Sequence, residues 1–356
     1  MLLLNQGGIL MKTKKLLSIV LTLLLVLTVG SCKNNQERID DINSEAVSSA
    51  IEEPPPITYT YSLTGLETTT PIKNNRPVAV TINNVYLAQK IQTGVGHADV
   101  VFETEVEGGI TRLLALYQNP TKEIAQIGSV RSVRVVFAEL VASMDALLIY
   151  HGTGKYAGER MSQLGIKKIG LNTNNYGKRI PNGLDWEHTL YTNGENLEAA
   201  LDNTGYGQGG IEEPWLNFSD EEITPSLVAS TKATAKFNAT YNTCFIYDSA
   251  NKTYQRGTNN SPFIDYVTGE TENFKNVFVL QTTMRYYSDG KMRDIDLDGG
   301  KGYYVTNGGY QEITWSKSGD YSPIKFKDME GNELAVNKGN SYICIMNQST
   351  SSFTAE

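Results

Sequence analysis

Short apolar runs in the first half of the chain predict four β-strands and one helix. The four runs are rich in β-branched and aromatic residues and cover Pro77–Asn83, Asp99–Glu107, Thr111–Tyr117 and Ala146–His151. Between the last two, apolar residues recur at the helical spacing, at Val133, Phe137, Leu140, Val141 and Met144. We expect Ser132 or Ser129 to cap this helix. The pattern predicts a mixed α/β domain.

The second half of the chain reads as mostly β. Its strand-like runs are Val277–Tyr287, Gly302–Thr306, Gln311–Ser316 and Ser341–Met346. Turn signals such as Asp289-Gly290 and Asn307-Gly308-Gly309 separate them. We therefore predict an α+β protein, in which a mixed α/β N-terminal domain (residues 61–225) precedes a smaller, β-rich C-terminal domain (residues 235–356).

The N-terminus has the pattern of an export signal. Lysines at 12, 14 and 15 precede the apolar stretch Leu16–Val29, which is shorter than the roughly 20 residues of a membrane span. We expect translation to start at Met11 and residues 1–31 to act as a signal peptide.

The apolar stretch ends in Val29-Gly30-Ser31-Cys32, which resembles a bacterial lipobox. The resemblance implies cleavage before Cys32 and diacylation of its sulfur, which would hold the protein on the outer face of the cell membrane. The alternative is ordinary signal cleavage with an incidental cysteine. Residues 32–60 are polar, acidic and proline-containing, and we expect them to form a disordered tether.

Charge and cysteine content limit the partners. Removal of the three leader lysines leaves 28 basic and 39 acidic residues, a net charge of −11, which disfavours nucleic acid as a partner. Cys244 and Cys344 remain, and they either form a disulfide or stay as buried thiols. The histidines have no metal-ligand spacing, and we expect no metal and no cofactor.

The Gly108-Gly109 pair predicts a hairpin with a two-residue turn, because both glycines can adopt positive φ. That turn would place Glu105 opposite Arg112 and Glu103 opposite Leu114. One face would then carry Glu103, Glu105, Glu107 and Arg112, together with Leu114 and Leu116. The other face, toward the core, would carry Val100, Phe102, Val106, Leu113 and Tyr117.

Arginines supply the complementary charge. Arg131 and Arg134 lie at the predicted helix start, where the helix dipole does not favour them. With Asn83, Asn84 and His151 at strand ends, they complete a candidate polar cleft with Glu103, Glu105, Glu107 and Arg112. Three interpretations stay open: structural ion pairs, a ligand-binding cleft, or a catalytic carboxylate pair of the kind that cleaves glycosides.

Five motifs are distinctive: ADVVFETEVEGGITRLLALYQ at 98–118, IGSVRSVR at 127–134, YHGTG at 150–154, TGE at 268–270 and ITWSK at 313–317. Together they resemble the YerB-like family of bacterial lipoproteins. The resemblance extends from about Leu63 to Phe353 and departs near RIPNGLDWEHTLYT, where Glu187 precedes His188. It implies a two-domain extracytoplasmic lipoprotein connected with the cell wall, and it brings no established reaction.

These observations predict a non-catalytic binding or scaffold protein of the cell envelope, anchored to the membrane by its N-terminal lipid. Its expected partner is peptidoglycan or an envelope protein. One alternative is a cell-wall glycan hydrolase that uses Glu103 with Glu105 or Glu107. The other is a solute-binding lipoprotein of a transporter.

Overall fold

The computed structural model describes residues 57–171, 175–225 and 228–356. The predicted signal peptide, the lipidation site Cys32 and the predicted tether up to residue 56 lie outside the described residues. In the described part of the chain β-sheet dominates, and the four α-helices of that part all lie before Gly205.

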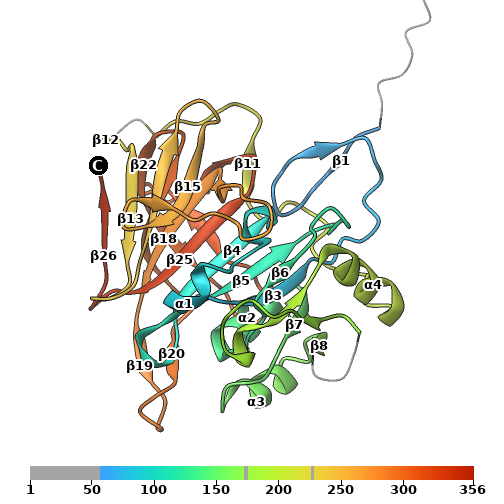
Figure 1. The fold of residues 1–356 in the computed structure, drawn as a ribbon. Coiled ribbons are helices and arrows are strands. Elements are labelled where there is room, and N and C mark those ends of the chain that lie inside the picture. The colour runs from blue at the N-terminus through green and yellow to red at the C-terminus, as the bar shows by residue number, and fades with distance from the viewer. Residues whose placement is uncertain (1–56, 172–174, 226–227) are drawn as a thin grey trace, which may run out of the picture. The chain divides into compact units, whose positions relative to one another are not determined.

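In the N-terminal part the helices lie among a larger number of strands (Figure 1). Its strands are β1 (Tyr59–Thr60), β2 (Glu67–Thr68), β3 (Val78–Asn83), β4 (Val100–Glu105), β5 (Thr111–Tyr117), β6 (Ile127–Gly128), β7 (Leu147–Tyr150), β8 (Lys168–Gly170), β9 (Lys178–Arg179), β10 (Leu190–Thr192) and β11 (Asn217–Ser219). Its helices are α1 (Tyr86–Gln89), α2 (Val135–Ser143), α3 (Ala157–Gln163) and α4 (Gly194–Thr204), with short 3-10 turns at Val95–His97, Glu107–Gly109 and Trp186–His188.

The C-terminal part consists of strands. They are β12 (Val228–Ala229), β13 (Lys232–Lys236), β14 (Asn242–Asp248), β15 (Thr253–Thr258), β16 (Ser261–Pro262), β17 (Asn273–Phe274), β18 (Asn276–Thr282), β19 (Met284–Tyr286), β20 (Arg293–Ile295), β21 (Gly299–Thr306), β22 (Gly309–Ser316), β23 (Lys325–Lys327), β24 (Ala335–Asn337), β25 (Ser341–Asn347) and β26 (Ser352–Ala355).

The strands predicted from apolar runs are confirmed. Thr111–Tyr117 is β5 with the predicted bounds, and β3, β4 and β7 lie inside the runs predicted for them. In the C-terminal half, the run predicted as one strand over Val277–Tyr287 is divided into β18 and β19.

The predicted helix is confirmed as α2, but its predicted cap is wrong. Arg134 is the N-cap residue, and no side chain caps the helix. The two serines lie in an extended segment instead, whose backbone is bonded to its neighbours. Asn83 donates its N–H to the Ser129 carbonyl (2.9 Å), and Arg131 donates its N–H to the Thr81 carbonyl (2.9 Å). Because these bonds hold residues 129–131 alongside β3, the helix begins only at Val135.

The predicted hairpin register is wrong by one residue. Gly108 and Gly109 both have positive φ, as predicted, but Glu107 belongs to the turn as well. Val106 donates its N–H to the Ile110 carbonyl (2.8 Å), so the loop has three residues. The pairs are therefore Glu105 with Thr111 and Thr104 with Arg112.

A shift of one residue exchanges the two faces of a strand. Glu103 pairs with Leu113, and both lie on the face opposite to Arg112. Leu114 and Leu116, predicted beside the glutamates, instead pack in one core with Val100, Phe102 and Val106. Leu113 and Tyr117 belong to the second core, on the other face of the sheet. The predicted single face with three glutamates and Arg112 does not exist.

One eleven-stranded sheet runs through both parts of the chain. Strand β25, from the C-terminal part, lies between β18 and β4 and is parallel to both (Figure 1). Beyond β4 the order is β5, β3, β7 and β8, so the N-terminal strands continue the C-terminal sheet without a break. Main-chain hydrogen bonds between β25 and β4 therefore join the two parts.

A second sheet of six strands, with β13, β14 and β15 at its centre, shares a core with one face of the large sheet. Cys344 on β25 is buried in this core, and Cys244 on β14 is also buried; both are free thiols. Burial raises the pKa of each thiol, as is typical of cysteines that serve packing rather than chemistry.

Candidate functional site

Glu103 lies in a closed hydrogen-bond network rather than in a cleft. Its Oε1 accepts from Asn84 Nδ2 (2.8 Å) and Thr111 Oγ1 (2.8 Å). Its Oε2 accepts from Thr243 Oγ1 (2.7 Å) and the Tyr342 hydroxyl (2.6 Å). Four donors surround this buried carboxylate, two from each half of the chain, and they match its hydrogen-bonding capacity.

The same network contains a buried arginine. Arg256 donates to Glu272 Oε2 (2.5 Å), Gln92 Oε1 (3.1 Å) and Asn84 Oδ1 (3.0 Å). Burial raises the pKa of Glu272 although the charge of Arg256 opposes this. Arg256 and Glu272 are both buried, so their charges compensate each other inside the protein. Asn84 and Glu103, two of the predicted cleft residues, therefore hold the two halves of the chain together.

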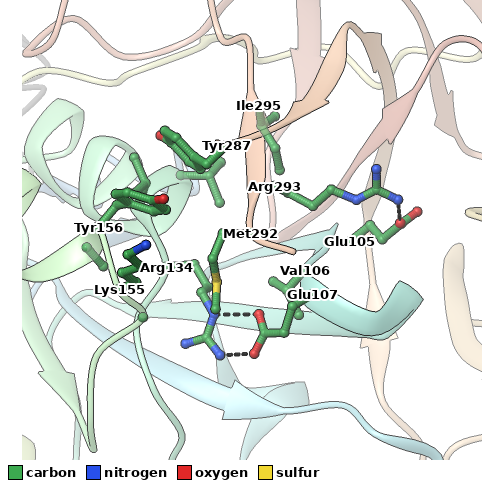
Figure 2. Close-up of a pocket in the computed structure, with 14 residues that line it drawn as sticks. Glu105, Val106, Glu107, Arg134, Lys155, Tyr156, Tyr287, Met292, Arg293 and Ile295 are labelled. Carbon is green, nitrogen blue, oxygen red and sulfur yellow. Dashed lines mark hydrogen bonds and ion pairs between the residues drawn. The ribbon is translucent and has the colours of Figure 1, made fainter. Parts of the chain in front are cut away.

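Glu105 and Glu107 each form an ion pair with an arginine, as Figure 2 shows. Glu105 is buried and forms an ion pair with Arg293 of β20. Glu107 receives two hydrogen bonds from Arg134, one of them from Nε at 2.6 Å. Partial burial acts to raise the pKa of Glu107, but Arg134 and the nearby Arg112 lower it to about 2.

These ion pairs flank a narrow pocket between the β4–β5 turn and the β19–β20 hairpin (Figure 2). Tyr156 and Tyr287 stack at its edge with ring centroids 4.4 Å apart. Burial raises the pKa of Tyr287 to about 12. The free volume inside the pocket is about 10 Å³, close to the room needed by one water molecule. This pocket is a packed contact between the hairpin and the N-terminal part, not a cavity for a larger ligand.

The remaining predicted residues come together at a third place. Asn83 ends β3, and His151 directly follows β7. Because β3 and β7 are parallel neighbours, both residues lie at the carboxyl edge of that pair, where open α/β sheets bind ligands. Arg112, at the start of β5, pairs with Asn83, and Arg131 donates its N–H to Thr81 of β3.

Arg112 is a buried cation without a paired carboxylate. It is 2% exposed, and its Nη1 donates to the Ser132 carbonyl (2.9 Å). Its Nε has no hydrogen-bond partner, and no carboxylate of the described residues lies within ion-pair distance. Burial and the charges of Arg134 and Arg131 lower the pKa of Arg112 to about 9, although the charges of Glu107 and Glu187 oppose this. The guanidinium group is therefore in a place that an anion would stabilise.

Arg131 is held by the segment that follows β9. Its Nη1 donates to the Glu187 carbonyl (2.9 Å), and its Nη2 to Glu187 Oε2 (3.0 Å). The Nδ1 atom of His188, the next residue, lies 2.7 Å from Asn83 Nδ2. Asn83 thus fixes the position of a loop, and His188 is buried beside it.

Two residues of this place were not predicted from the sequence, Arg179 and Trp186. Arg179 Nη2 lies 3.1 Å from His151 Nε2, and its Cζ lies 3.8 Å from the centroid of the Trp186 ring. Burial lowers the pKa of Arg179, and the charge of Arg131 lowers it further. The signal that identifies this loop is a tryptophan in a polar segment with Pro181 and Gly183, a composition that favours an exposed loop.

We call Arg112, Arg131, His151 and Arg179 the basic site. An open groove of about 460 Å³ adjoins it, lined by Arg179, Pro181, Asn182, Gly183, Leu184, Trp186 and Thr189. In the described ranges, no helix is both long and apolar enough to cross a bilayer, and no three potential metal ligands gather in one place.

Two family models match the N-terminal and the C-terminal part of the chain. Residues 63–207 match the N-terminal domain of DUF3048, a protein family of unknown function, and residues 233–343 match its C-terminal domain. A protein of Bacillus subtilis (strain 168) named "Putative lipoprotein YerB" is 28% identical over 295 residues, which are 80% of this chain and 85% of the relative.

A crystal structure of the YerB protein from Bacillus subtilis matches the fold with a TM-score of 0.70 and 26% sequence identity. The match covers 83% of this chain and 99% of that structure. Both domains, the sequence relative and the solved structure lead to the same family, so the chain belongs to the YerB-like family with its N- and C-terminal DUF3048 domains.

Proposed function

We propose that this protein is a lipid-anchored, extracytoplasmic binding protein of the bacterial cell envelope. Its receptive surface is the basic site, and its partner is an anionic component of the cell wall. The anchor is Cys32, at the end of a lipobox-like sequence, and a relative that carries lipoprotein in its name supports it.

One observation carries the binding role: Arg112 is buried beside other arginines without a carboxylate of its own. Leaving a buried charge unpaired is costly, so folded proteins normally pair it or bind an ion there. The protein could pair Arg112 with a glutamate, as it pairs Arg134 with Glu107. Arg112 lacks such an internal partner, in contrast to Arg134, because it binds an external anion.

The positions of the glutamates do not favour a glycan hydrolase. A general acid must reach the leaving oxygen of its substrate, whereas both oxygens of Glu103 are taken by four internal donors. Glu105 and Glu107 each hold an arginine. The glutamates therefore support the fold, and the arginines remain for binding.

The test is co-sedimentation of the full-length protein, purified in mild detergent, with insoluble peptidoglycan. We expect binding that weakens as salt rises, because charge attraction contributes to it. Arg131→Gln should reduce the bound fraction, whereas Lys327→Gln, which removes an exposed charge on β23, should not. Release of soluble fragments, or equal binding by both variants, would contradict the proposal.

A further inference from the structure

The basic site and its groove together define the class of ligand. We propose that they bind a saccharide bearing a carboxylate or phosphate group, with the anion at Arg112 and Arg131 and the sugar ring against Trp186. This inference rests on the proposed function and deepens it.

The charge balance at the basic site favours an anion. Arg112, Arg131 and Arg179 bring three guanidinium groups, and Glu187 is the one carboxylate of the described chain in ion-pair contact with any of them. This positive excess is local, since the whole chain has a net charge of −8. An arginine cluster within an acidic protein is a specific feature, because the overall charge would repel the same ligand elsewhere.

Hydrogen-bond donors at the basic site are unused. The Nε atoms of Arg112 and Arg131 are buried without a hydrogen-bond partner. Buried donors without partners are rare, and each represents a cost that a ligand oxygen could remove. The planar guanidinium group binds carboxylate and phosphate oxygens through such N–H groups.

Trp186 supplies a surface for the ring of a sugar. Its side chain is 71% exposed although it is large and apolar. The guanidinium group of Arg179 covers one face of the indole ring. The other face can pack against the C–H groups of a pyranose ring, since aromatic rings offer a large apolar surface. Arg179 thus connects the aromatic surface to the charged side chains.

The groove is held in place before any ligand arrives. Arg179 Nη1 donates to the Trp186 carbonyl (2.6 Å), and Ile180 donates its N–H to the Thr189 carbonyl (2.7 Å). Asn182 donates to the His188 carbonyl (2.8 Å) and to the Tyr191 hydroxyl (2.8 Å). A pre-organised loop loses less entropy on binding. The groove volume of about 460 Å³ is in the range of small-molecule sites.

The probes are N-acetylmuramic acid, which carries a carboxylate, N-acetylglucosamine, which lacks it, and inorganic phosphate. The full-length protein contains three tryptophans, and Trp215 and Trp315 are buried. Protection of fluorescence from acrylamide quenching therefore reports on Trp186. Calorimetry measures the affinities, including those of the Trp186 variant.

We expect the acidic sugar to bind at least about tenfold more tightly than the neutral one, because only it can pair with the arginines. Arg131→Gln should remove this preference, and Trp186→Ala should weaken both sugars by about tenfold. Tyr321→Ala, another exposed aromatic residue, and Lys327→Gln are the matched controls. Arg131 and Trp186 are chosen because a change at the buried Arg112 could also unfold the protein.

Equal affinity for both sugars, or no effect of Trp186→Ala, would overturn the inference. Phosphate binding as tightly as the acidic sugar would show a simple anion site and would overturn it as well. If wall binding still depends on Arg131 while no sugar binds, this inference fails and the proposed function stands. If the protein shows neither Arg131-dependent wall binding nor sugar binding, the inference and the proposed function both fail.

Discussion

The hydroxyl group of Tyr342 donates a 2.6 Å hydrogen bond to the carboxylate of Glu103, a residue 239 positions earlier in the chain. Tyr342 lies on β25 and Glu103 on β4, the two parallel strands through which the C-terminal part joins the N-terminal sheet. The bond is buried on both sides. It therefore connects the two family domains by a side-chain contact as well as by the strand pairing.

Tyr342→Phe should lower the free energy of unfolding by about 1.5–3 kcal/mol, the usual contribution of a hydrogen bond to a charged group. The ring would keep its packing against Phe245 and Phe274, so the loss reports on the hydroxyl alone. Urea unfolding of the full-length protein measures it. Tyr321→Phe, at an exposed tyrosine, is the control, and equal stability of the two variants would contradict the assignment.

Glu103→Gln should destabilise the protein without altering ligand binding. An amide keeps the shape of the side chain but removes the charge near Arg256, and it directs an NH₂ group toward surrounding donors. Breaking a buried charged network of this kind costs about 3–5 kcal/mol. Urea unfolding and peptidoglycan co-sedimentation on the same samples separate the two effects. Normal stability with lost binding would instead place Glu103 in a binding site.

The sequence predicts the strands of this fold better than their arrangement. Apolar runs identify β5 to the residue and α2 to within two residues of its start, because burial of alternate or helical positions leaves a local pattern. The register of β4 against β5 depends on one loop residue, Glu107, and local composition does not decide it. The joining of β25 to β4 depends on a long-range contact that no local pattern records.

The same limit applies to the candidate site. The sequence identifies charged and amide residues at strand ends, among them Asn83, Arg112 and His151, and the structure brings these three together. It does not predict that Asn84 and Glu103 are directed to the opposite face, since the face follows from the register. The ligand interpretation itself stays a prediction for Arg131 and the other members of the basic site.

Removing Arg293 should be more harmful than removing its whole ion pair. Glu105 is buried, and Arg293→Met would leave its carboxylate without a strong partner. We expect a loss of about 3–5 kcal/mol, whereas Arg293→Met combined with Glu105→Gln should recover most of it, because no charge then remains unpaired. A double-mutant cycle measured by urea unfolding checks this. Additive losses in the double variant would show that the pair does not interact.

At acidic pH, the free energy of unfolding should depend on the ionisation of Glu107. Its pKa is lowered from 4.5 to about 2 in the folded protein, mainly by Arg134 acting against partial burial. Between these two values the unfolded chain binds more protons than the folded one, so the free energy of unfolding rises with pH. The stabilisation is complete above about pH 4.5 and is lost as the pH falls through about 2.

A shift of this size sets an upper limit of about 3 kcal/mol. The Glu107 side chain is 27% exposed, so screening by solvent reduces the expected contribution to about 1–2 kcal/mol. Glu107→Gln cannot ionise and should lower stability by that amount at pH 6. Near pH 2.5 the difference should shrink, because the carboxyl of the original protein is then partly protonated. Unfolding in urea at a series of pH values gives both curves.

Glu330→Gln, at an exposed turn, corrects for the general loss of one negative charge. If the Glu107 and Glu330 variants fall below the original protein by equal amounts at every pH, the Arg134 pair contributes nothing specific. A difference that is confined to Glu107 and closes toward low pH would show that the pair fixes the β4–β5 turn beside α2. That turn sets the register of Arg112, so its stability bears directly on the geometry of the basic site.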